Sequence, residues 1–345
     1  MKKIAFLLSL IMLLSACCFG CASKPTLQIL NWGDYIDPEL IKQFEKEFNC
    51  SVKYDTMANN EEMVIKLESS SCIYDLCFPS DYIIEKLIAE DLLHPINKDN
   101  IPNMKNIDPQ FLNLSFDPNN TYSVPYMWGT VGILYNTTMI DEPVDSWGIL
   151  FDKKYSGQIL MYDSMRDTIG ITLIYLGYSI NTRNEAEVNA ARDALVAQKP
   201  IVKAYLGDTI KDSMIAGNAA LSVVYSGDAV WCCDSEEGNP DLAYAVPKEG
   251  SNFWFDNAII PKTSKNTDLA EKFLDFLNRP EVAMQNSQYI GYTTPNKAAL
   301  DLMDEDWLSD ETYNPPQKII DRCDIFHDLG DFTPVFSAAW DKIIY

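Results

Sequence analysis

The sequence predicts an α/β protein with two lobes, each built around a largely parallel sheet. Short apolar segments typical of strands alternate with segments of helical periodicity, which is the pattern of βαβ units. The alternation occurs in both halves of the chain, and no repeat, low-complexity tract or long flexible linker separates them. With 345 residues, 47% of them hydrophobic, the chain can fill two cores, so we expect two lobes joined by chain crossings.

The first half of the chain begins with a strand and a capped helix. Residues 27–30 form an apolar strand segment, and Asp37 followed by Pro38 is typical of a helix start, with a side-chain cap and a proline at the first helical position. Apolar residues then recur at helical spacing until Asn49, where we expect the helix to end. The next predicted segments are a strand at 52–54, a helix around 63–67 and a strand at 73–78.

The second half of the chain repeats this alternation. An apolar strand at 159–162 is followed by an apolar helix that runs through Leu176. Because a helix between two strands allows them to lie parallel, we expect parallel neighbours in this half as well. The remaining predicted segments are strands at 220–225, 242–246 and 258–260 and helices at 269–277 and 335–344.

The N-terminal segment has the features of an export signal. Two lysines precede an apolar run at 4–14, which is too short to span a bilayer of about 30 Å. The run ends in Leu-Ser-Ala-Cys, which resembles the lipobox of bacterial lipoproteins and would make Cys17 the lipidated residue. We therefore expect residues 1–16 to be a signal peptide and residues 17–25 to be a lipidated N-terminus and tether. An uncleaved membrane helix is the alternative.

The overall charge excludes several classes of function. Fifty acidic residues against 27 basic ones give a formal net charge of −23, which argues against nucleic-acid binding. The two histidines, His94 and His327, are too few for a multi-histidine metal site or an ordinary histidine-based triad, so we expect no metal ion and no cofactor. Outside the N-terminal segment, the cysteine spacing matches no disulfide or zinc pattern and leaves the redox state open for Cys50, Cys72, Cys77, Cys232, Cys233 and Cys323.

Aromatic and acidic residues stand where the predicted strands end. In open α/β sheets, ligands bind beyond the carboxyl ends of the strands. Ring faces attract an ammonium group with about 0.5–2 kcal/mol each, and carboxylates fix it by charge-assisted hydrogen bonds. The pattern therefore favours a slender organic cation as the ligand. The segments of this kind lie at 31–35, 79–82, 162–167 and 224–228, with two more at 253–256 and 291–292.

A resemblance to a known family rests on five motifs. They are Asn31-Trp32-Gly33-Asp34-Tyr35, Pro79-Ser80-Asp81-Tyr82, Pro125-Tyr126-Met127-Trp128-Gly129, Phe253-Trp254-Phe255-Asp256 and Gly291-Tyr292-Thr293-Thr294-Pro295-Asn296. Through them the chain resembles the spermidine/putrescine-binding proteins of bacterial polyamine ABC transporters from about Leu27 to Tyr345. The resemblance implies a two-lobed periplasmic-binding-protein-like fold, in which each lobe is a mixed, mainly parallel sheet flanked by helices and the ligand cleft lies between the lobes. The implied division assigns 26–133 plus 255–299 to lobe 1 and 134–254 plus 300–345 to lobe 2.

The resemblance also implies a ligand site. Ser164 stands where spermidine-preferring members have a second acid, and Tyr225 where they have tryptophan. Asp228 looks like the acid of putrescine-preferring members, so the choice of polyamine stays open. Trp254 would stack on the methylene spacer of the ligand. The implied ligand-binding residues are Trp32, Asp34, Tyr35, Ser80, Tyr82, Asp167, Tyr225, Asp228, Trp254, Asp256 and Tyr292.

The function implied by the resemblance is transport rather than catalysis. The protein would be the substrate-binding lipoprotein of an ABC importer, capturing putrescine or spermidine by lobe closure and delivering it to a membrane permease and its ATPase. We expect an exported monomer, lipid-anchored to the outer face of the cell membrane, or on the periplasmic side if there are two membranes. Two alternatives stay open: the same fold binding another organic cation such as choline, and a secreted carboxylate-based hydrolase.

Overall fold

The computed structural model describes residues 24–345 except 235 and 237. The predicted signal peptide and the lipidation site at Cys17 lie outside the described residues. Within the described part of the chain, no helix is long and apolar enough to cross a membrane.

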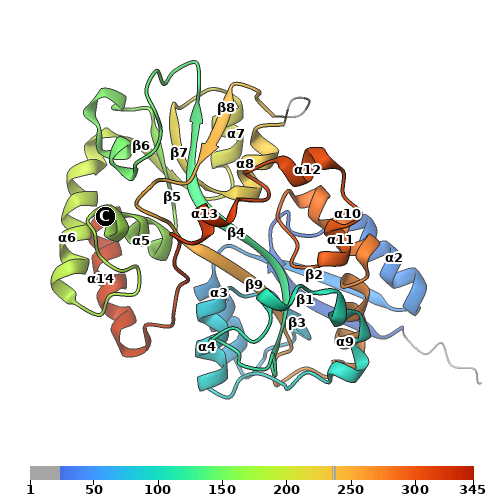
Figure 1. Ribbon diagram of the computed structural model, residues 1–345. Helices are drawn as coiled ribbons and strands as arrows, with labels where there is room; N and C mark the ends of the chain where they lie inside the picture. The colour runs from blue at the N-terminus through green and yellow to red at the C-terminus, as the bar shows by residue number, and fades with distance from the viewer. Residues whose placement is uncertain (1–23, 235, 237) are drawn as a thin grey trace, which may run out of the picture.

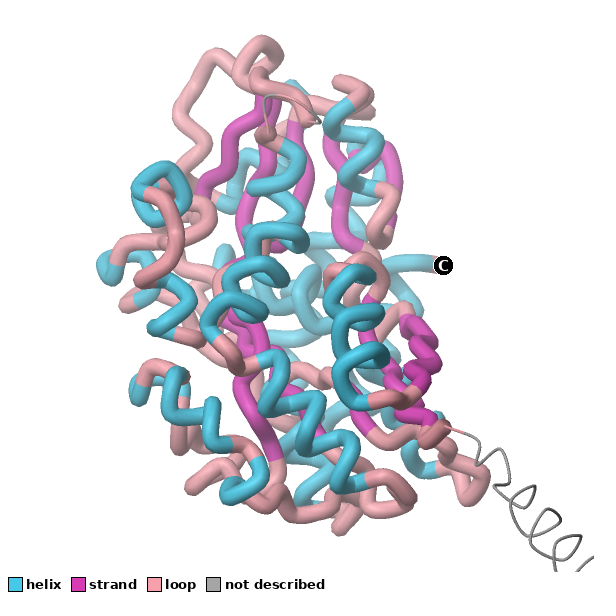
Figure 2. The backbone as a smooth tube through the Cα atoms, turned by 90° about the vertical axis from the view of Figure 1, so that its right-hand side faces the viewer, coloured by secondary structure: helices cyan, strands magenta, loops and turns pink. Residues whose placement is uncertain are grey.

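The strands form a continuous curled sheet in the order β2-β1-β3-β9-β4-β7-β5-β6, with β8 also paired to β4. Helices lie in front of and behind the strands, as Figure 2 shows from the side. The strands are β1 (Thr26–Trp32), β2 (Ser51–Met57), β3 (Leu76–Cys77), β4 (Ser123–Asn136), β5 (Ile159–Tyr162), β6 (Val202–Leu206), β7 (Leu221–Tyr225), β8 (Leu242–Ala245) and β9 (Phe253–Ile259). The helices are α2 (Pro38–Phe48), α3 (Asn60–Glu68), α4 (Asp81–Ala89), α5 (Met165–Tyr175), α6 (Glu185–Gln198), α7 (Ile210–Ile215), α8 (Ser226–Cys232), α9 (Thr267–Leu277), α10 (Pro280–Ile290), α11 (Lys297–Leu300), α12 (Glu305–Ser309), α13 (Gln317–Ile320) and α14 (Thr333–Ile344).

Strand β4 joins two lobes. Its first part pairs antiparallel with β9, and its last residues, from Val131 on, pair antiparallel with β7 and β8. In Figure 1 the lower lobe holds β1–β3, β9 and α2–α4, and the upper lobe holds β5–β8, α5–α7 and α14. Each lobe also has parallel pairs, β1 with β2 and β3, and β5 with β6 and β7. The predicted two-lobed fold with mixed sheets is confirmed.

Helix α2 confirms the start and the end that its sequence predicts. The Asp37 side chain accepts a hydrogen bond from the Glu39 amide, which satisfies one of the free N–H groups of the first turn. Pro38 takes the first helical position, and Asn49 ends the helix in the left-handed conformation with φ 48°. The helix therefore begins and ends where the sequence predicts.

Strand lengths differ from the prediction where tertiary contacts decide them. The strand predicted at 73–78 shortens to two residues because the Asp75 carboxylate turns inward and accepts hydrogen bonds from the Gln28 and Asn266 amides. Strand β9 begins at Phe253 rather than at 258, so the segment 253–256 lies inside a strand and not after one. This corrects the prediction that the segment stands at a strand end.

The division of the chain between the lobes remains a prediction. Helix α14 lies against α5 and α6 of the upper lobe. The segment before it contacts α10, which is joined to the start of α2 in the lower lobe by the hydrogen bond from the Asp37 amide to Asn286. The hydroxyl of the buried Tyr313 lies 2.7 Å from the Ser287 hydroxyl, and the Tyr313 carbonyl accepts a hydrogen bond from Thr293. The chain after residue 300 therefore contacts both lobes.

The junction in β4 depends on a glycine. A Cβ atom added to Gly132 would lie 2.4 Å from the Tyr244 ring, whose hydroxyl donates to the Thr130 carbonyl at 3.1 Å. Gly132→Ala should therefore lower the free energy of unfolding by about 1–3 kcal/mol, the usual cost of overpacking. Urea unfolding of the ligand-free protein measures this.

Gly207→Ala is the matched control for that substitution. Nothing lies within 4 Å of a Cβ atom added to Gly207. The control should change the unfolding free energy by less than about 1 kcal/mol. Equal unfolding midpoints for the two variants would contradict the close contact between β4 and β8.

Candidate functional site

A cavity of about 1260 Å³ lies between the lobes. All of the predicted ligand-binding side chains line it, so the structure brings together residues that are far apart in sequence. They are Trp32, Asp34, Tyr35, Ser80, Tyr82, Asp167, Tyr225, Asp228, Trp254, Asp256 and Tyr292.

Asp256 forms the centre of the lower wall. Its Oδ2 accepts a hydrogen bond from the Tyr35 hydroxyl at 2.8 Å, and its Oδ1 accepts one from Ser80 Oγ at 2.7 Å. The side chain is only 6% exposed, and burial raises its pKa from the ordinary 3.8 to about 7. The hydroxyl groups of Tyr35 and Ser80 stabilise the ionised form only in part. This carboxylate therefore gains strongly from an added cation.

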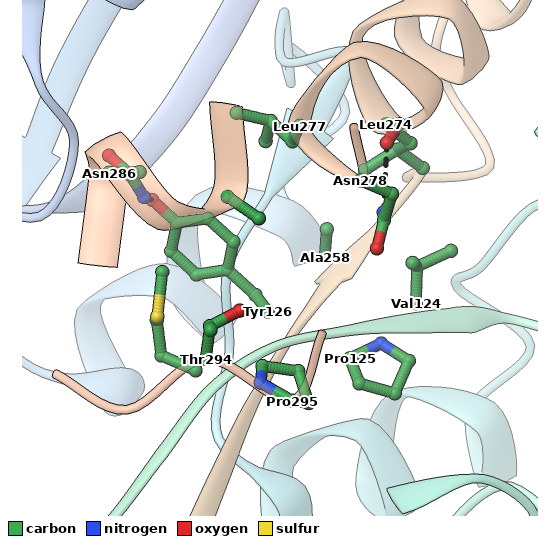
Figure 3. A pocket seen from close by; sticks show the side chains of 12 residues that line it. Val124, Pro125, Tyr126, Ala258, Leu274, Leu277, Asn278, Asn286, Thr294 and Pro295 are labelled. Atoms are coloured by element: carbon green, nitrogen blue, oxygen red, sulfur yellow. Dashed lines mark hydrogen bonds between the residues drawn. The ribbon is translucent and has the colours of Figure 1, made fainter. Parts of the chain in front are cut away.

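A layer of hydrogen-bonded side chains behind the wall positions Tyr35. The Tyr126 hydroxyl donates to the Tyr35 carbonyl and accepts a hydrogen bond from Asn286 Nδ2 at 2.8 Å. The Asn286 side-chain oxygen in turn accepts from the Asp37 amide at the start of α2. Figure 3 shows Tyr126 and Asn286 beside a small void of about 10 Å³, which holds one water molecule at most. This region supports the site and does not admit a ligand.

A cation–π contact joins the two lobes at one end of the cavity. The Arg166 guanidinium of α5 lies 4.8 Å from the centre of the Tyr82 ring and 4.4 Å from that of Phe326. Its nitrogens donate to the His327 carbonyl at 3.2 Å. The Tyr82 hydroxyl accepts a hydrogen bond from Asn60 Nδ2. Because Tyr82 follows β3 and Arg166 follows β5, this contact links the lower and upper walls.

Asp167 forms the centre of the upper wall. Its Oδ2 accepts hydrogen bonds from the Ser164 and Tyr225 hydroxyls, each at 2.7 Å, and its Oδ1 accepts one from Asn252 Nδ2 at 3.4 Å. Burial raises the pKa of Asp167, while these hydrogen bonds lower it. Ser164 therefore orients Asp167 and also caps α5.

A row of aromatic rings crosses the cavity between the two acids. Tyr35 and Tyr292 lie edge to face with their centres 5.3 Å apart, Tyr292 and Trp254 are 5.4 Å apart, and Trp254 and Tyr225 are 5.8 Å apart. The Trp254 indole N–H is buried and has no hydrogen-bond partner among the described residues. Trp32, also lining the cavity, donates its indole N–H to the Phe78 carbonyl at 2.9 Å. The row presents an apolar path between charged ends.

Asp228 and Asp34 differ from the two central acids because a lysine lies between them. Lys211 Nζ is 3.6 Å from Asp228 Oδ1 and 3.8 Å from Asp34 Oδ2. Asp228 is buried in the first turn of α8, whereas the Asp34 side chain is 86% exposed at the mouth of the cavity. Burial raises the pKa of Asp228 and Lys211 lowers it. Asp34 is therefore a rim residue.

Several cavity residues were not predicted from the sequence. Asn60 and Asn252 hold Ser80, Tyr82 and Asp167 by hydrogen bonds, but single asparagines carry no sequence signature. Arg166 and Lys211 were not predicted because a binding site for a cation is expected to contain acidic and aromatic residues rather than basic ones. Glu61 lies in the first turn of α3, where an acidic residue is ordinarily explained by its favourable interaction with the helix dipole. The missed residues are Asn60, Glu61, Arg166, Lys211 and Asn252.

Two lobes joined by β4, with a ligand-sized cavity between them, define a periplasmic-binding-protein-like solute receptor. Comparison with known families agrees with this class. The chain belongs to the bacterial extracellular solute-binding protein family, whose model matches residues 39–315.

Individual relatives confirm the resemblance seen in the motifs. The spermidine/putrescine-binding periplasmic protein of Salmonella typhimurium is 36% identical over 324 residues, which cover 93% of this chain and 92% of the relative. A Listeria monocytogenes structure described as a spermidine/putrescine ABC transporter is 44% identical with a TM-score of 0.89, covering 92% of this chain and 98% of that one. The spermidine/putrescine ABC transporter substrate-binding protein of Streptococcus pneumoniae is 40% identical with a TM-score of 0.78, covering 92% and 99%.

Proposed function

We propose that this protein captures a polyamine, putrescine or spermidine, in the cavity between its lobes and delivers it to the permease of an ABC importer. The observation that carries the proposal is the pair of buried carboxylates, Asp256 and Asp167, on opposite walls with a row of rings between them. Polyamines are slender chains with ammonium groups separated by methylene spacers. Their ammonium groups match the acids by charge-assisted hydrogen bonds, and their spacers match the rings.

Binding would drive closure because the ligand gains most when both walls contact it. An ammonium group at Asp256 touches the lower lobe, and one at Asp167 touches the upper lobe. A ligand shifts a conformational equilibrium by its differential affinity for the two states, so a diammonium chain favours the closed form. The four aromatic residues of the row and Trp32 would surround the spacer, while Ser80 and Tyr82 support the lower wall.

The remaining features of the proposal concern location and partners. The relatives are polyamine-binding components of ABC transporters, which supports a role in import without catalysis. We propose that the protein acts as an exported monomer, lipid-anchored through Cys17 to the outer face of the membrane. Mass spectrometry of the protein extracted from membranes with detergent would show a lipid-modified Cys17 as the N-terminal residue.

Calorimetric titration of ligand-stripped protein tests the ligand class. We expect one putrescine or spermidine to bind per chain and choline to give no signal, because a quaternary ammonium has no N–H to donate to Asp256 or Asp167. Spermine is included as a longer comparison. Choline binding more tightly than the polyamines, or silence from all four ligands in a folded protein, would overturn the proposal. Hydrolysis of a chromogenic glycoside would instead favour the carboxylate-based hydrolase.

A further inference from the structure

Lys211 is an unusual residue for a cavity that would receive cations. Among the described residues that line the cavity, acidic side chains outnumber basic ones several-fold, and the basic ones are Arg166 and Lys211. Arg166 is held at one end of the cavity by a hydrogen bond to the His327 carbonyl and by contacts with aromatic rings. Lys211, on α7, instead places its ammonium group between two carboxylates, Asp228 of the upper lobe and Asp34 of the lower lobe.

The surroundings of Lys211 stabilise its charged ammonium group between Asp228 and Asp34. Its side chain is 16% exposed, and its Nζ lies 6.0 Å from the centre of the Trp231 ring. Burial lowers the pKa of Lys211, but the carboxylates of Asp228, Asp208 and Asp34 together raise it by more than burial lowers it. The net shift of the pKa is therefore upward. The group is therefore charged at neutral pH.

Four buried acids line the cavity in the described part of the chain. Asp81 accepts hydrogen bonds from the backbone amides of Tyr82 and Phe255, and the other three acids divide into two kinds. Asp256 and Asp167 accept hydrogen bonds from neutral hydroxyl and amide groups, and in the described chain no lysine, arginine or histidine nitrogen lies within 4.0 Å of either carboxylate. Asp228 already has a cation at 3.6 Å. Of these three carboxylates, Asp256 and Asp167 thus remain open for ligand ammonium groups, and Asp228 is occupied by an ammonium group of the protein itself.

We propose that Lys211 is a specificity-determining residue, a resident ammonium group that fills the Asp228 position and makes the cavity select a diamine over a triamine. The inference rests on the proposed function, because it concerns the choice among polyamines. A diamine such as putrescine satisfies Asp256 and Asp167. The third ammonium of spermidine finds no open carboxylate at Asp228 and faces the like charge of Lys211.

The test compares putrescine and spermidine affinities in Lys211→Met, which removes the charge and keeps a chain of similar length. We expect the wild-type protein to bind putrescine more tightly. In Lys211→Met, the ratio of the spermidine Kd to the putrescine Kd should fall about tenfold or more, because Asp228 becomes available to the third ammonium. Calorimetric titration of the ligand-stripped proteins gives both constants.

Three further variants make the result specific. Lys211→Arg keeps the positive charge and should retain the wild-type ratio. Adding Asp228→Asn to Lys211→Met removes the released carboxylate, so the ratio should return toward the wild-type value. Lys272→Met makes the same change on the exposed side of α9, outside the cavity lining, and should leave both constants unchanged.

The outcomes separate this inference from the function on which it rests. An unchanged ratio in Lys211→Met, or an equal loss of affinity for both polyamines, would overturn the specificity role while leaving polyamine binding intact. A wild-type protein that binds neither polyamine would overturn the proposed function itself. Thermal unfolding of each variant confirms that the compared proteins are folded.

Discussion

Replacing Asp256 by asparagine should weaken polyamine binding by about 10- to 150-fold. The substitution keeps the shape of the side chain and its place between Tyr35 and Ser80, but removes the charge that an ammonium group would meet. Hydrogen bonds to charged groups contribute about 1.5–3 kcal/mol, and about 1.4 kcal/mol corresponds to tenfold in affinity. Calorimetric titration with putrescine and spermidine measures the change.

Asp268→Asn is the matched control for this effect. Asp268 lies exposed in the first turn of α9, so the same chemical change there leaves the cavity untouched. Its Kd values should equal those of the wild-type protein. Equal titration curves for Asp256→Asn and Asp268→Asn would show that Asp256 does not receive the ligand.

The fold could be predicted where local chemistry decides it. The cap at Asp37, the proline after it and the stop at Asn49 act within one helix, so sequence spacing was sufficient. Strand β4 was not predicted, because 13 of its 14 residues are buried and it shows no polar alternation. It also contains Pro125, which lies at a register shift in the pairing with β9. Its role in joining the lobes arises from pairings distant in sequence.

Part of the candidate site could be predicted because its acids follow strands directly in the sequence. Asp167 and Asp228 each stand in the first turn of a helix after a strand, where topology gathers side chains at one sheet edge. Asp256 is inside β9, and it was identified through the resemblance and not through a strand-end rule. The position of Lys211 between two acids could not be predicted, since it depends on how α7, α8 and the loop after β1 meet.

The same substitution at Asp256 should have the opposite effect on the stability of the ligand-free protein. In the unfolded chain the carboxyl has its ordinary pKa of 3.8, whereas burial raises it to about 7 in the fold. Between these two values the folded protein holds a proton that the unfolded chain has released. The stability contributed by this group is therefore fully present below about pH 4 and is lost as the pH rises to about 7.

Asp256→Asn should thus be more stable than the ligand-free wild-type protein at pH 8, by up to about 4 kcal/mol at about 1.4 kcal/mol per pH unit. Near pH 4 the two proteins should be nearly equal, since both then carry a neutral side chain. Urea unfolding at pH 4.5, 6 and 8 measures the difference. Repulsion from Asp167 helps to raise the pKa of Asp256, and repulsion from Asp256 helps to raise that of Asp81, so the substitution also relieves these like-charge contacts at pH 8.

Putrescine should narrow this difference by about 1.5–3 kcal/mol, which corresponds to the 10- to 150-fold weaker binding of the variant. At pH 8 a saturating ligand stabilises the wild-type fold in proportion to the logarithm of its concentration over Kd, and the weaker-binding variant gains less. Without ligand, Asp256→Asn would then have the larger free energy of unfolding. Added putrescine would raise the free energy of unfolding less in this variant than in the wild-type protein. If Asp256→Asn is instead less stable at every pH without ligand, the carboxylate serves the fold and not the ligand. The expected narrowing would mean that an uncompensated buried charge is retained for the cation that it receives.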